Sequence, residues 1–325
     1  MLARVCLAAL AALLLVLRPA PSSAAPALVF DPFKGTVVYA EDPDMLWHPA
    51  SITKLMTAYL VFEALRDGKF KMDSMVTCSA NANKQAPSKL GLPVGAKIRV
   101  ELALRALMVK SANDVAVMLA EKVSGTEAAF VARMNETAKR LGMTRTRFYN
   151  PNGLPHARQV TTARDIAMLA RALLKEFPEY NYFYTLQSMN IGKRRLRSHN
   201  KLLKSFEGAD GMKTGFVCAS GYNLVASATR DGRKLVAVVF GGRSGTLRNQ
   251  RAASLLDYGF QRYEWKSKFG ESLDSLAIQA SLTEGPINMR PYTCVRRKVR
   301  RRKRKRRVTK PRTPTKAVTT TKKKR

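Results

Sequence analysis

Two pairs of short apolar, β-branched runs open and close the central part of the chain. Residues 27–31 and 36–41 flank the turn-forming sequence D-P-F-K-G. Residues 222–229 and 234–242 flank the turn sequence R-D-G-R. Each pair of runs predicts a β-hairpin, because β-branched segments on either side of a Gly- and Asp-containing turn are typical of paired strands.

The residues between these hairpins carry helical patterns. Apolar residues recur at three- and four-residue spacing after Ser51, on both sides of Ser111, and from Thr162 onward. A last helix is expected from about residue 249 to 260. Strands at both ends with helices inserted between them predict an α/β fold, an antiparallel sheet with a helical insert.

The start of the chain has the pattern of a secretory signal peptide. Arg4 precedes an apolar run from Val5 to Leu17, and small residues follow. The run is shorter than the roughly 20 residues that a membrane-spanning helix needs. We therefore expect residues 1–25 to be cleaved near Ala24 or Ala25, and the mature protein to be exported to the periplasm or the outer face of the cytoplasmic membrane.

The other end of the chain is strongly basic. Residues 291–325 contain 18 Lys or Arg and no Asp or Glu, about half of the formal net charge of +35. Such a segment cannot bury a core, so we expect a disordered arm, joined by a linker (266–290) to a body (26–265). After export, anionic membranes or cell-wall polyanions are its expected partners and nucleic acid is disfavoured. The alternative is a solvated arm without a specific partner.

Cysteine and histidine positions indicate neither a metal site nor a cofactor site. The predicted mature chain keeps Cys78, Cys218 and Cys294, and its three histidines are scattered. One disulfide plus one free thiol fits an oxidising compartment. We nevertheless expect Cys78 and Cys218 to be ordinary buried thiols.

Three short motifs carry the candidate chemistry: S-I-T-K at residues 51–54, S-A-N at 111–113 and K-T-G at 213–215. Only K-T-G occurs once, so local context has to select the other two. A second S-x-x-K at 198–201 lies in a Gly-flanked, Lys- and Arg-rich stretch, whereas Ser51 begins a long apolar-striped helix. We therefore prefer residues 51–54.

Ser51 and Lys54 form a candidate nucleophile and base. A serine hydroxyl needs an adjacent base, and residues three apart on a helix are surface neighbours. The start of a helix also offers free backbone N–H groups to a reacting oxygen. Since an ammonium cannot accept a proton, Lys54 must be neutral at least transiently, which burial and nearby cations favour.

Ser111 and Asn113 lie between two helical patterns, where a short turn can direct side chains into a cleft. Ser111 is a candidate proton relay, and Asn113 a candidate ligand for a substrate amide. The alternative is that both residues cap the helix beginning at Asp114. The two roles do not exclude each other.

The K-T-G motif is expected at the start of a strand that lines a cleft. A strand edge there can pair with an extended peptide, with Lys213 and Thr214 meeting a terminal carboxylate. Gly215 is expected to let the substrate approach closely. A plain turn followed by a strand is the alternative.

Four stretches, P-A-S-I-T-K-L-M-T-A-Y, S-A-N-D-V-A, G-L-P followed by T-T-A-R-D-I-A-M-L-A, and D-G-M-K-T-G-F, resemble one known family. Through them, residues 26–263 are similar to the serine D-alanyl-D-alanine carboxypeptidases of the low-molecular-mass penicillin-binding proteins. The resemblance implies the penicillin-binding, β-lactamase-like transpeptidase fold. That fold has an antiparallel sheet flanked by helices plus an all-helical subdomain, with the three motifs in one cleft.

The resemblance implies an acyl-serine reaction on the D-Ala-D-Ala end of a peptidoglycan peptide. Ser51 would be acylated with Lys54 as general base, while Ser111 shuttles protons. The backbone N–H groups of Ser51 and Phe216 would form the oxyanion hole. β-Lactams, which imitate D-Ala-D-Ala, are expected to acylate Ser51 as well.

The resemblance also implies how substrate is held. Asn113 would bind the substrate backbone, and Lys213 with Thr214 would bind the terminal carboxylate. Arg248 matches a family arginine near that carboxylate. Phe216 occupies a position where some members have histidine, so side-chain help there is in doubt. The β-rich domain and amphipathic anchoring helix of many members are not expected here, and the basic arm would tether the body instead.

Two other functions fit part of this pattern. A class A β-lactamase needs a glutamate to activate the deacylating water, and the stretch N-P-N-G-L-P-H-A-R-Q after residue 149 offers no E-x-x-x-N. A non-catalytic cell-wall or polyanion-binding protein has no need of Lys54. Both alternatives are therefore less favoured than peptide trimming.

Overall fold

The computed structural model describes residues 25–278 and 285–294. The predicted signal peptide up to residue 24 and the arm beyond Cys294 lie outside these ranges. Within them, no helix combines the length and the apolar character that crossing a membrane requires.

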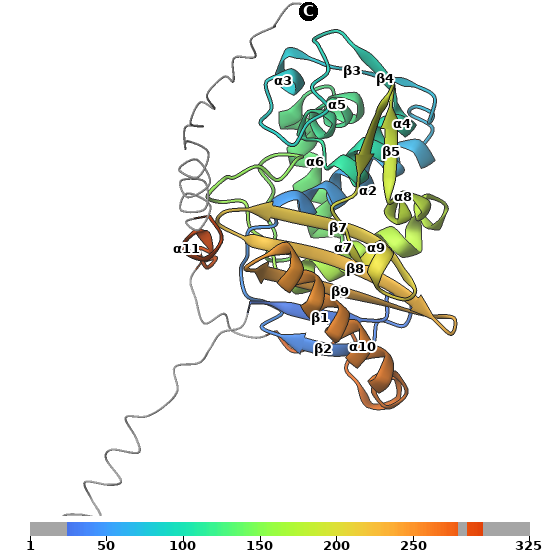
Figure 1. Ribbon diagram of the computed structural model, residues 1–325, viewed down its shortest axis with the longest axis vertical. Coiled ribbons are helices and arrows are strands. Elements are labelled where there is room, and N and C mark those ends of the chain that lie inside the picture. Colours follow the sequence, from blue (N-terminus) through green and yellow to red (C-terminus); the bar gives the residue numbers. More distant parts are fainter. Residues whose placement is uncertain (1–24, 279–284, 295–325) are drawn as a thin grey trace, which may run out of the picture.

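A five-stranded antiparallel sheet forms the lower half of the molecule (Figure 1). Its strands are β1 (Ala27–Phe30), β2 (Val37–Glu41), β7 (Ala209–Val217), β8 (Gly221–Arg230) and β9 (Arg233–Gly242), in the spatial order β2-β1-β9-β8-β7. Both predicted hairpins, β1–β2 and β8–β9, are confirmed, and β1 pairs with β9 to join them. β7 pairs with β8 and forms one edge of the sheet.

Helices cover both faces of this sheet. Along β1 and β9, successive side chains alternate between two apolar clusters, because neighbouring residues on a strand face opposite sides. Leu28 and Val238 belong to the cluster shared with α7 (Ala163–Glu176). Val29 and Ala237 belong to the cluster beneath α10 (Gly245–Phe269). Burial on both faces explains why these strands are apolar almost throughout rather than alternating.

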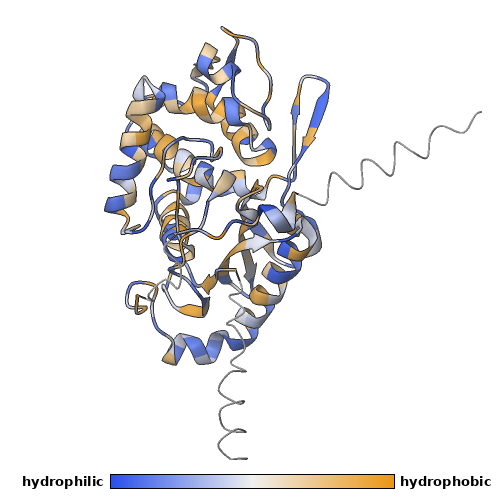
Figure 2. Ribbon diagram, turned by 90° about the vertical axis from the view of Figure 1, so that its left-hand side faces the viewer, coloured by the Kyte–Doolittle hydropathy of each residue, from blue (hydrophilic) through white to orange (hydrophobic). Residues whose placement is uncertain are grey.

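The long segment between β2 and β7 forms the helical part of the molecule. It contains η1 (Ala50–Thr53), α2 (Lys54–Arg66), β3 (Met75–Thr77), α3 (Ala80–Asn83), β4 (Lys97–Arg99), α4 (Val100–Arg105), η2 (Ala106–Lys110), α5 (Asn113–Ser124), α6 (Glu127–Arg140), α7, η3 (Pro178–Tyr180), α8 (Tyr182–Thr185), β5 (Ser188–Ile191), β6 (Arg194–Arg197) and α9 (Leu202–Ser205). Figure 2 shows hydrophobic residues along the inward sides of these helices.

Helix α2 is the centre of the helical part. Every residue from Lys54 to Ala64 is buried, because α5, α6 and α7 all pack against this helix. We expected an apolar stripe on one face, and the helix is instead enclosed on nearly all sides. One consequence is that its first residue, a lysine, lies in the interior.

The body continues past the boundary that we expected at residue 265. Helix α10 begins at Gly245 and ends at Phe269, which makes it longer at both ends than the predicted 249–260. The first part of the expected linker is hydrogen-bonded to the body, since Leu273 N–H donates to the carbonyl oxygen of Gly35. Arg164 also donates to the carbonyl oxygens of Leu276 and Ala277.

A disulfide joins Cys218, just after β7, to Cys294, just after the short helix α11 (Arg290–Thr293). The expectation that Cys218 is a free thiol is therefore wrong, whereas Cys78 is a buried free cysteine as predicted. The partners are 76 residues apart in the sequence, and only the three-dimensional path of the chain brings them together. The bridge fixes the end of the described chain beside the edge strand β7.

Candidate active site

A cleft of about 600 Å³ lies between the edge strand β7, the start of η1, the turn before α5 and the start of α10. Its lining residues are Ser51, Pro87, Ser88, Ser111, Asn113, Gly153, Leu154, His199, Lys201, Thr214, Gly215, Phe216, Val217, Tyr222, Gly245, Thr246, Arg248 and Asn249. Seven of the nine predicted site residues are among them. The other two, Lys54 and Lys213, are buried and hydrogen-bonded to cleft serines.

Ser51 lies in the first turn of η1, and Lys54 is the first residue of α2. This helical start places the serine hydroxyl near unpaired backbone N–H groups. Lys54 Nζ is 3.0 Å from Ser51 Oγ, and the lysine side chain is fully buried. The predicted nucleophile and base are thus within hydrogen-bond distance.

The surroundings of Lys54 suit an uncharged amine. Its Nζ donates to Asn113 Oδ1 at 2.7 Å and to the carbonyl oxygen of Asn152. These two oxygens can only accept, so they use both N–H bonds of a neutral amine and leave its lone pair for the third neighbour, Ser51. When the amine is neutral, the serine hydroxyl can donate toward this lone pair, as a general base requires.

The pKa of Lys54 is shifted in the direction that keeps it neutral. Burial lowers this pKa well below 10.5, and the positive charge of Lys213 lowers it further. The negative charge of Asp114 acts in the opposite direction but is the smallest of the three causes. Desolvation is therefore the main cause that favours the neutral amine.

Ser111 occupies the left-handed turn between η2 and α5, with φ of 58° and ψ of 40°. Its Oγ accepts a hydrogen bond of 2.9 Å from Lys213 Nζ. The capping alternative is wrong, because the N-cap of α5 is Ala112 and no side chain caps that helix. Asn113 instead bridges the cleft, accepting from Lys54 and donating through Nδ2 to the carbonyl oxygen of Ala86.

Lys213 and Arg248 form a buried positive region at one end of the cleft. Their exposed fractions are 1% and 5%, and neither has a carboxylate partner among the residues that the structure describes. Burial, followed by the charge of Arg248, lowers the pKa of Lys213 to about 7. Burial also lowers the pKa of Arg248 to about 10. Unpaired buried cations are costly, so this region favours an anionic ligand.

The K-T-G motif lies within β7 rather than at its start. A Cβ on Gly215 would lie 3.0 Å from the carbonyl oxygen of Pro49 and 3.1 Å from the backbone nitrogens of Ser51 and Ile52. Gly215 therefore allows the close approach of β7 to the start of η1, and it also lines the cleft, where its role toward a substrate stays a prediction. Phe216, the next residue, packs its ring on Tyr222 and lies along the cleft.

Sequence reasoning missed part of the site. Asn152 acts through a backbone carbonyl, which no side-chain motif reveals. Gly153 has φ of +81°, and a Cβ there would lie 1.9 Å from the carbonyl oxygen of Ala50, so only glycine fits. The N-P-N-G sequence was the available signal. Lys201, dismissed with the 198–201 motif, does line the cleft, whereas Ser198 Oγ accepts from the N–H of Asn200.

The described residues contain no group of three or more His, Cys, Asp or Glu side chains placed to hold a metal ion. The lining of the cleft is also free of Asp and Glu within the described part of the chain.

The family model and the curated relatives that match this chain carry the same description, D-alanyl-D-alanine carboxypeptidase. Residues 17–244 match the family described as D-alanyl-D-alanine carboxypeptidase. The chain is 37% identical over 234 residues to the D-alanyl-D-alanine carboxypeptidase DacF of Bacillus subtilis, covering 71% of this chain and 60% of that protein. It is 35% identical over 244 residues to DacC of Escherichia coli, covering 73% and 61%. The chain thus spans about three fifths of the length of these relatives.

Solved structures confirm the expected fold. Penicillin binding protein 5 from Haemophilus influenzae superposes with a TM-score of 0.70 at 35% identity, covering 75% of this chain and 73% of that one. Penicillin-Binding Protein D2 from Listeria monocytogenes, solved in a cefotaxime-bound form, gives a TM-score of 0.67 at 30% identity and covers 75% and 100%.

The charge of Lys213 predicts a measurable shift in the pH dependence of acylation. With Lys54 as the predicted base, we expect the rate of Ser51 acylation by a fluorescent penicillin to rise with pH as Lys54 loses its proton, at a pH well below 10.5. In Lys213→Met a neighbouring cation is lost, the protonated form of Lys54 is stabilised, and this rising limb moves to higher pH. The matched variant Lys204→Met changes an exposed lysine outside the cleft and leaves the limb in place. A limb that stays fixed or moves down in Lys213→Met contradicts this account of Lys54.

Proposed function

The chain belongs to the D-alanyl-D-alanine carboxypeptidase family of peptidases, and from this membership we propose that it removes the terminal D-alanine of peptidoglycan peptides. The observation that carries the proposal is the pairing of two features in one cleft. A serine lies beside a buried, neutral base, and a buried positive region without a carboxylate partner in the described residues lies next to it. The first feature cleaves an acyl bond, and the second selects a free carboxylate end.

The acylation step follows from these positions. Lys54 takes the proton of Ser51 while Ser51 Oγ attacks the carbonyl carbon of the penultimate D-alanine. The N–H groups of Ser51 and Phe216 stabilise the oxyanion. The C–N bond then breaks, and the terminal D-alanine leaves as its amine with a proton relayed through Ser111. Ser111 accepts a hydrogen bond from Lys213, which holds its hydroxyl in the cleft.

Water completes the reaction. It attacks the ester carbonyl and gives its proton to Lys54, and the C–O bond to Ser51 breaks with return of a proton to the serine. Until D-alanine leaves, its terminal carboxylate is held near Lys213, Thr214 and Arg248, which supplies the anion that this region otherwise lacks. Asn113 holds the substrate amide while its Oδ1 orients Lys54.

The same site supports acylation by β-lactams, and one relative was solved with cefotaxime bound. A class A-like β-lactamase is less favoured, because the described cleft lining contains no carboxylate to activate water against the lactam-derived ester. A non-catalytic binding protein is less favoured because it has no use for a buried base beside a serine. The proposed enzyme therefore forms a long-lived penicillin adduct and hydrolyses peptides.

Export and surface attachment complete the proposal. We infer that the N-terminal 25 residues direct the chain out of the cytoplasm, where peptidoglycan is found. The arm beyond Cys294 carries all 18 Lys and Arg of residues 291–325, which favours binding to anionic membranes or cell-wall polyanions.

The reaction is tested with a pentapeptide ending in D-Ala-D-Ala. Free D-alanine is released by the intact chain, and Ser51→Ala abolishes both this release and labelling by a fluorescent penicillin. Ser198→Ala, in the other S-x-x-K, is the matched control and keeps both activities within about twofold. Rapid turnover of the penicillin would favour a β-lactamase, and absence of label and of D-alanine would favour a binding protein.

Attachment is tested by sedimentation with liposomes containing an anionic lipid. The full mature chain sediments with them, and a chain ending at Cys294 stays in solution, because this truncation removes the basic residues but keeps the disulfide. Liposomes of neutral lipid are the control. Equal sedimentation of the two chains rules out the arm as the attachment element.

A further inference from the structure

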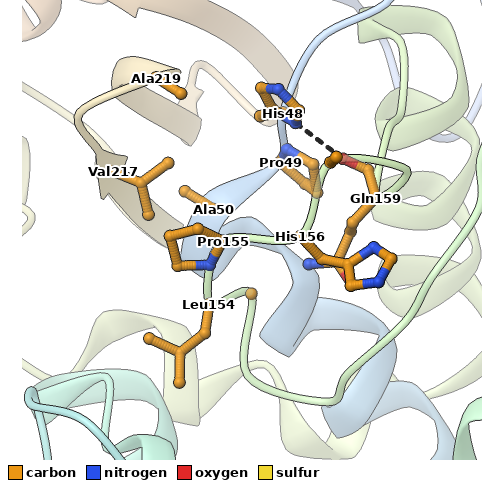
Figure 3. A pocket seen from close by; sticks show the side chains of 11 residues that line it. His48, Pro49, Ala50, Leu154, Pro155, His156, Gln159, Val217 and Ala219 are labelled. Atoms are coloured by element: carbon orange, nitrogen blue, oxygen red, sulfur yellow. Dashed lines mark hydrogen bonds between the residues drawn. The ribbon is translucent and has the colours of Figure 1, made fainter. Parts of the chain in front are cut away.

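The small pocket in Figure 3, of about 210 Å³, adjoins the cleft and shares Gly153, Leu154 and Val217 with it. A feature that the proposed reaction does not use lies farther away, on α10. The start of this helix lines the cleft, and its last turns reach the lower end of the molecule (Figure 1).

The last turns of α10 carry aromatic side chains on their outward face. One side of the helix presents Tyr258, Arg262, Trp265 and Phe269, which follow each other at spacings of four, three and four residues. We call these four residues the aromatic stripe. The opposite side of the helix is buried and includes Ala252, Leu256, Gly259 and Tyr263. The exposed fractions of Tyr258, Trp265 and Phe269 are 39%, 58% and 72%.

The rings of the stripe are ordered by contacts among themselves and with cations. The ring centroids of Trp265 and Phe269 are 6.0 Å apart. Lys266 Nζ lies 5.1 Å from the centroid of Trp265, and the guanidinium carbon of Arg262 lies 6.0 Å from that of Tyr258. These contacts hold the side chains in place before a ligand arrives, so little side-chain freedom is lost on docking.

The surroundings of the stripe are positively charged. Residues 258–270 include three cations, Arg262, Lys266 and Lys268, and one acid, Glu264. Glu264 pairs with Arg233 of β9, whereas the three cations have no carboxylate partner among the described residues. Exposed rings beside unpaired cations suit the surface of an anionic membrane, where rings lie at the headgroup level and cations meet the headgroup phosphates.

The size of the stripe disfavours a stable protein partner. With roughly 200 Å² per ring side chain, its three rings expose on the order of 350 Å² at the observed fractions. A stable protein interface buries about 800 Å² on each partner. A lipid surface needs no such area when a second element holds the chain nearby.

We propose that the aromatic stripe docks on the lipid of an anionic membrane, with Trp265 and Phe269 inserted at the headgroup level. The proposal rests on the proposed attachment of the basic arm, which makes the first contact and raises the local concentration of the stripe at the lipid. The stripe is too small to hold the chain on a membrane without the arm. Arg262, Lys266 and Lys268 add contacts to anionic headgroups.

Docking through the end of α10 gives the attached enzyme a preferred orientation. Arg248, at the cleft, precedes Trp265 by 17 residues, which corresponds to about 25 Å along the helix axis. The cleft therefore stays clear of the lipid. A tether alone would not set this separation.

The test uses the fluorescence of Trp265. The chain has two tryptophans, and Trp47 is only 1% exposed, so Trp265 is the one that can meet lipid. The full mature chain with a C-terminal hexahistidine tag is held on phosphatidylglycerol liposomes that contain a nickel-chelating lipid, so it reaches the membrane whether or not the arm binds. We expect its emission to shift to shorter wavelength, and to be quenched when the liposomes contain lipid brominated near the headgroup. Trp265→Phe keeps an aromatic ring but removes the quenched signal.

Untagged variants measure the contribution of the stripe to binding. Replacing two exposed rings, by Trp265→Ser together with Phe269→Ser, lowers the affinity of the full chain for anionic liposomes about tenfold. This factor is the same at low and high salt because apolar contacts are not screened, whereas the contribution of the arm falls with salt. Tyr182→Ser removes an exposed aromatic residue of α8 outside the stripe and keeps the affinity within about twofold. The rate of penicillin acylation stays unchanged in these variants, which shows that the cleft is intact.

Two results would overturn the proposal. One is emission of the tagged chain that lipid does not shift and brominated lipid does not quench. The other is an unchanged lipid affinity of the double variant, or its loss of a dimer seen in sedimentation velocity, which would assign the stripe to a second copy of the chain. If the untagged chain does not bind lipid, the arm is rejected, and the tagged chain still decides on the stripe. D-alanine release is measured separately and bears only on the carboxypeptidase.

Discussion

The active-site arrangement depends on the burial of one amino group, that of Lys54. Lys54 is fully enclosed, and burial lowers the pKa of its amine well below 10.5, which favours the neutral form. A neutral amine still has two N–H bonds to satisfy, and Asn113 and Asn152 provide the acceptors. These bonds aim the remaining lone pair at Ser51. Burial normally makes a lysine side chain costly because it disfavours the charged form. Here the same effect lowers the pKa of Lys54, which suits a role as a base.

The fold supplies that environment by joining its two parts at the site. Helix α2 lies in the middle of the helical part, with its first residue where that part meets the sheet. The edge strand β7 approaches the start of η1 so closely that a Cβ at residue 215 would crowd its backbone, and the loop carrying Asn152 approaches so closely that residue 153 must be glycine. Lys213 lies on β7, and its positive charge lowers the pKa of Lys54 further. The close packing of the backbone and the charge of Lys213 therefore both shape the environment of Lys54.

Much of the fold and site could be read from the sequence because its signals were local. The two hairpins and the three motifs are encoded in adjacent residues, and both hairpins and one shared cleft are observed. Features that depend on distant contacts could not be read. The enclosure of α2 depends on its packing against three other helices, and the Cys218–Cys294 disulfide joins residues that are 76 apart in the sequence. Asn152 contributes its backbone carbonyl oxygen, a group that every residue type has and that no motif can therefore identify. Gly215 has a further reason that the sequence could not show, since the backbone of Pro49, Ser51 and Ile52 crowds the position of its Cβ.

The central claim is that Lys54 is neutral when it meets Ser51, and its pKa can be measured directly. The intact chain is labelled with ε-¹³C-lysine, and its NMR resonances are followed with pH, the Lys54 signal being the one missing in Lys54→Gln. We predict that this resonance titrates well below 10.5, the ordinary value for lysine. A resonance that titrates at or above 10.5 would contradict the account, because Ser51 would then face an ammonium that cannot accept its proton.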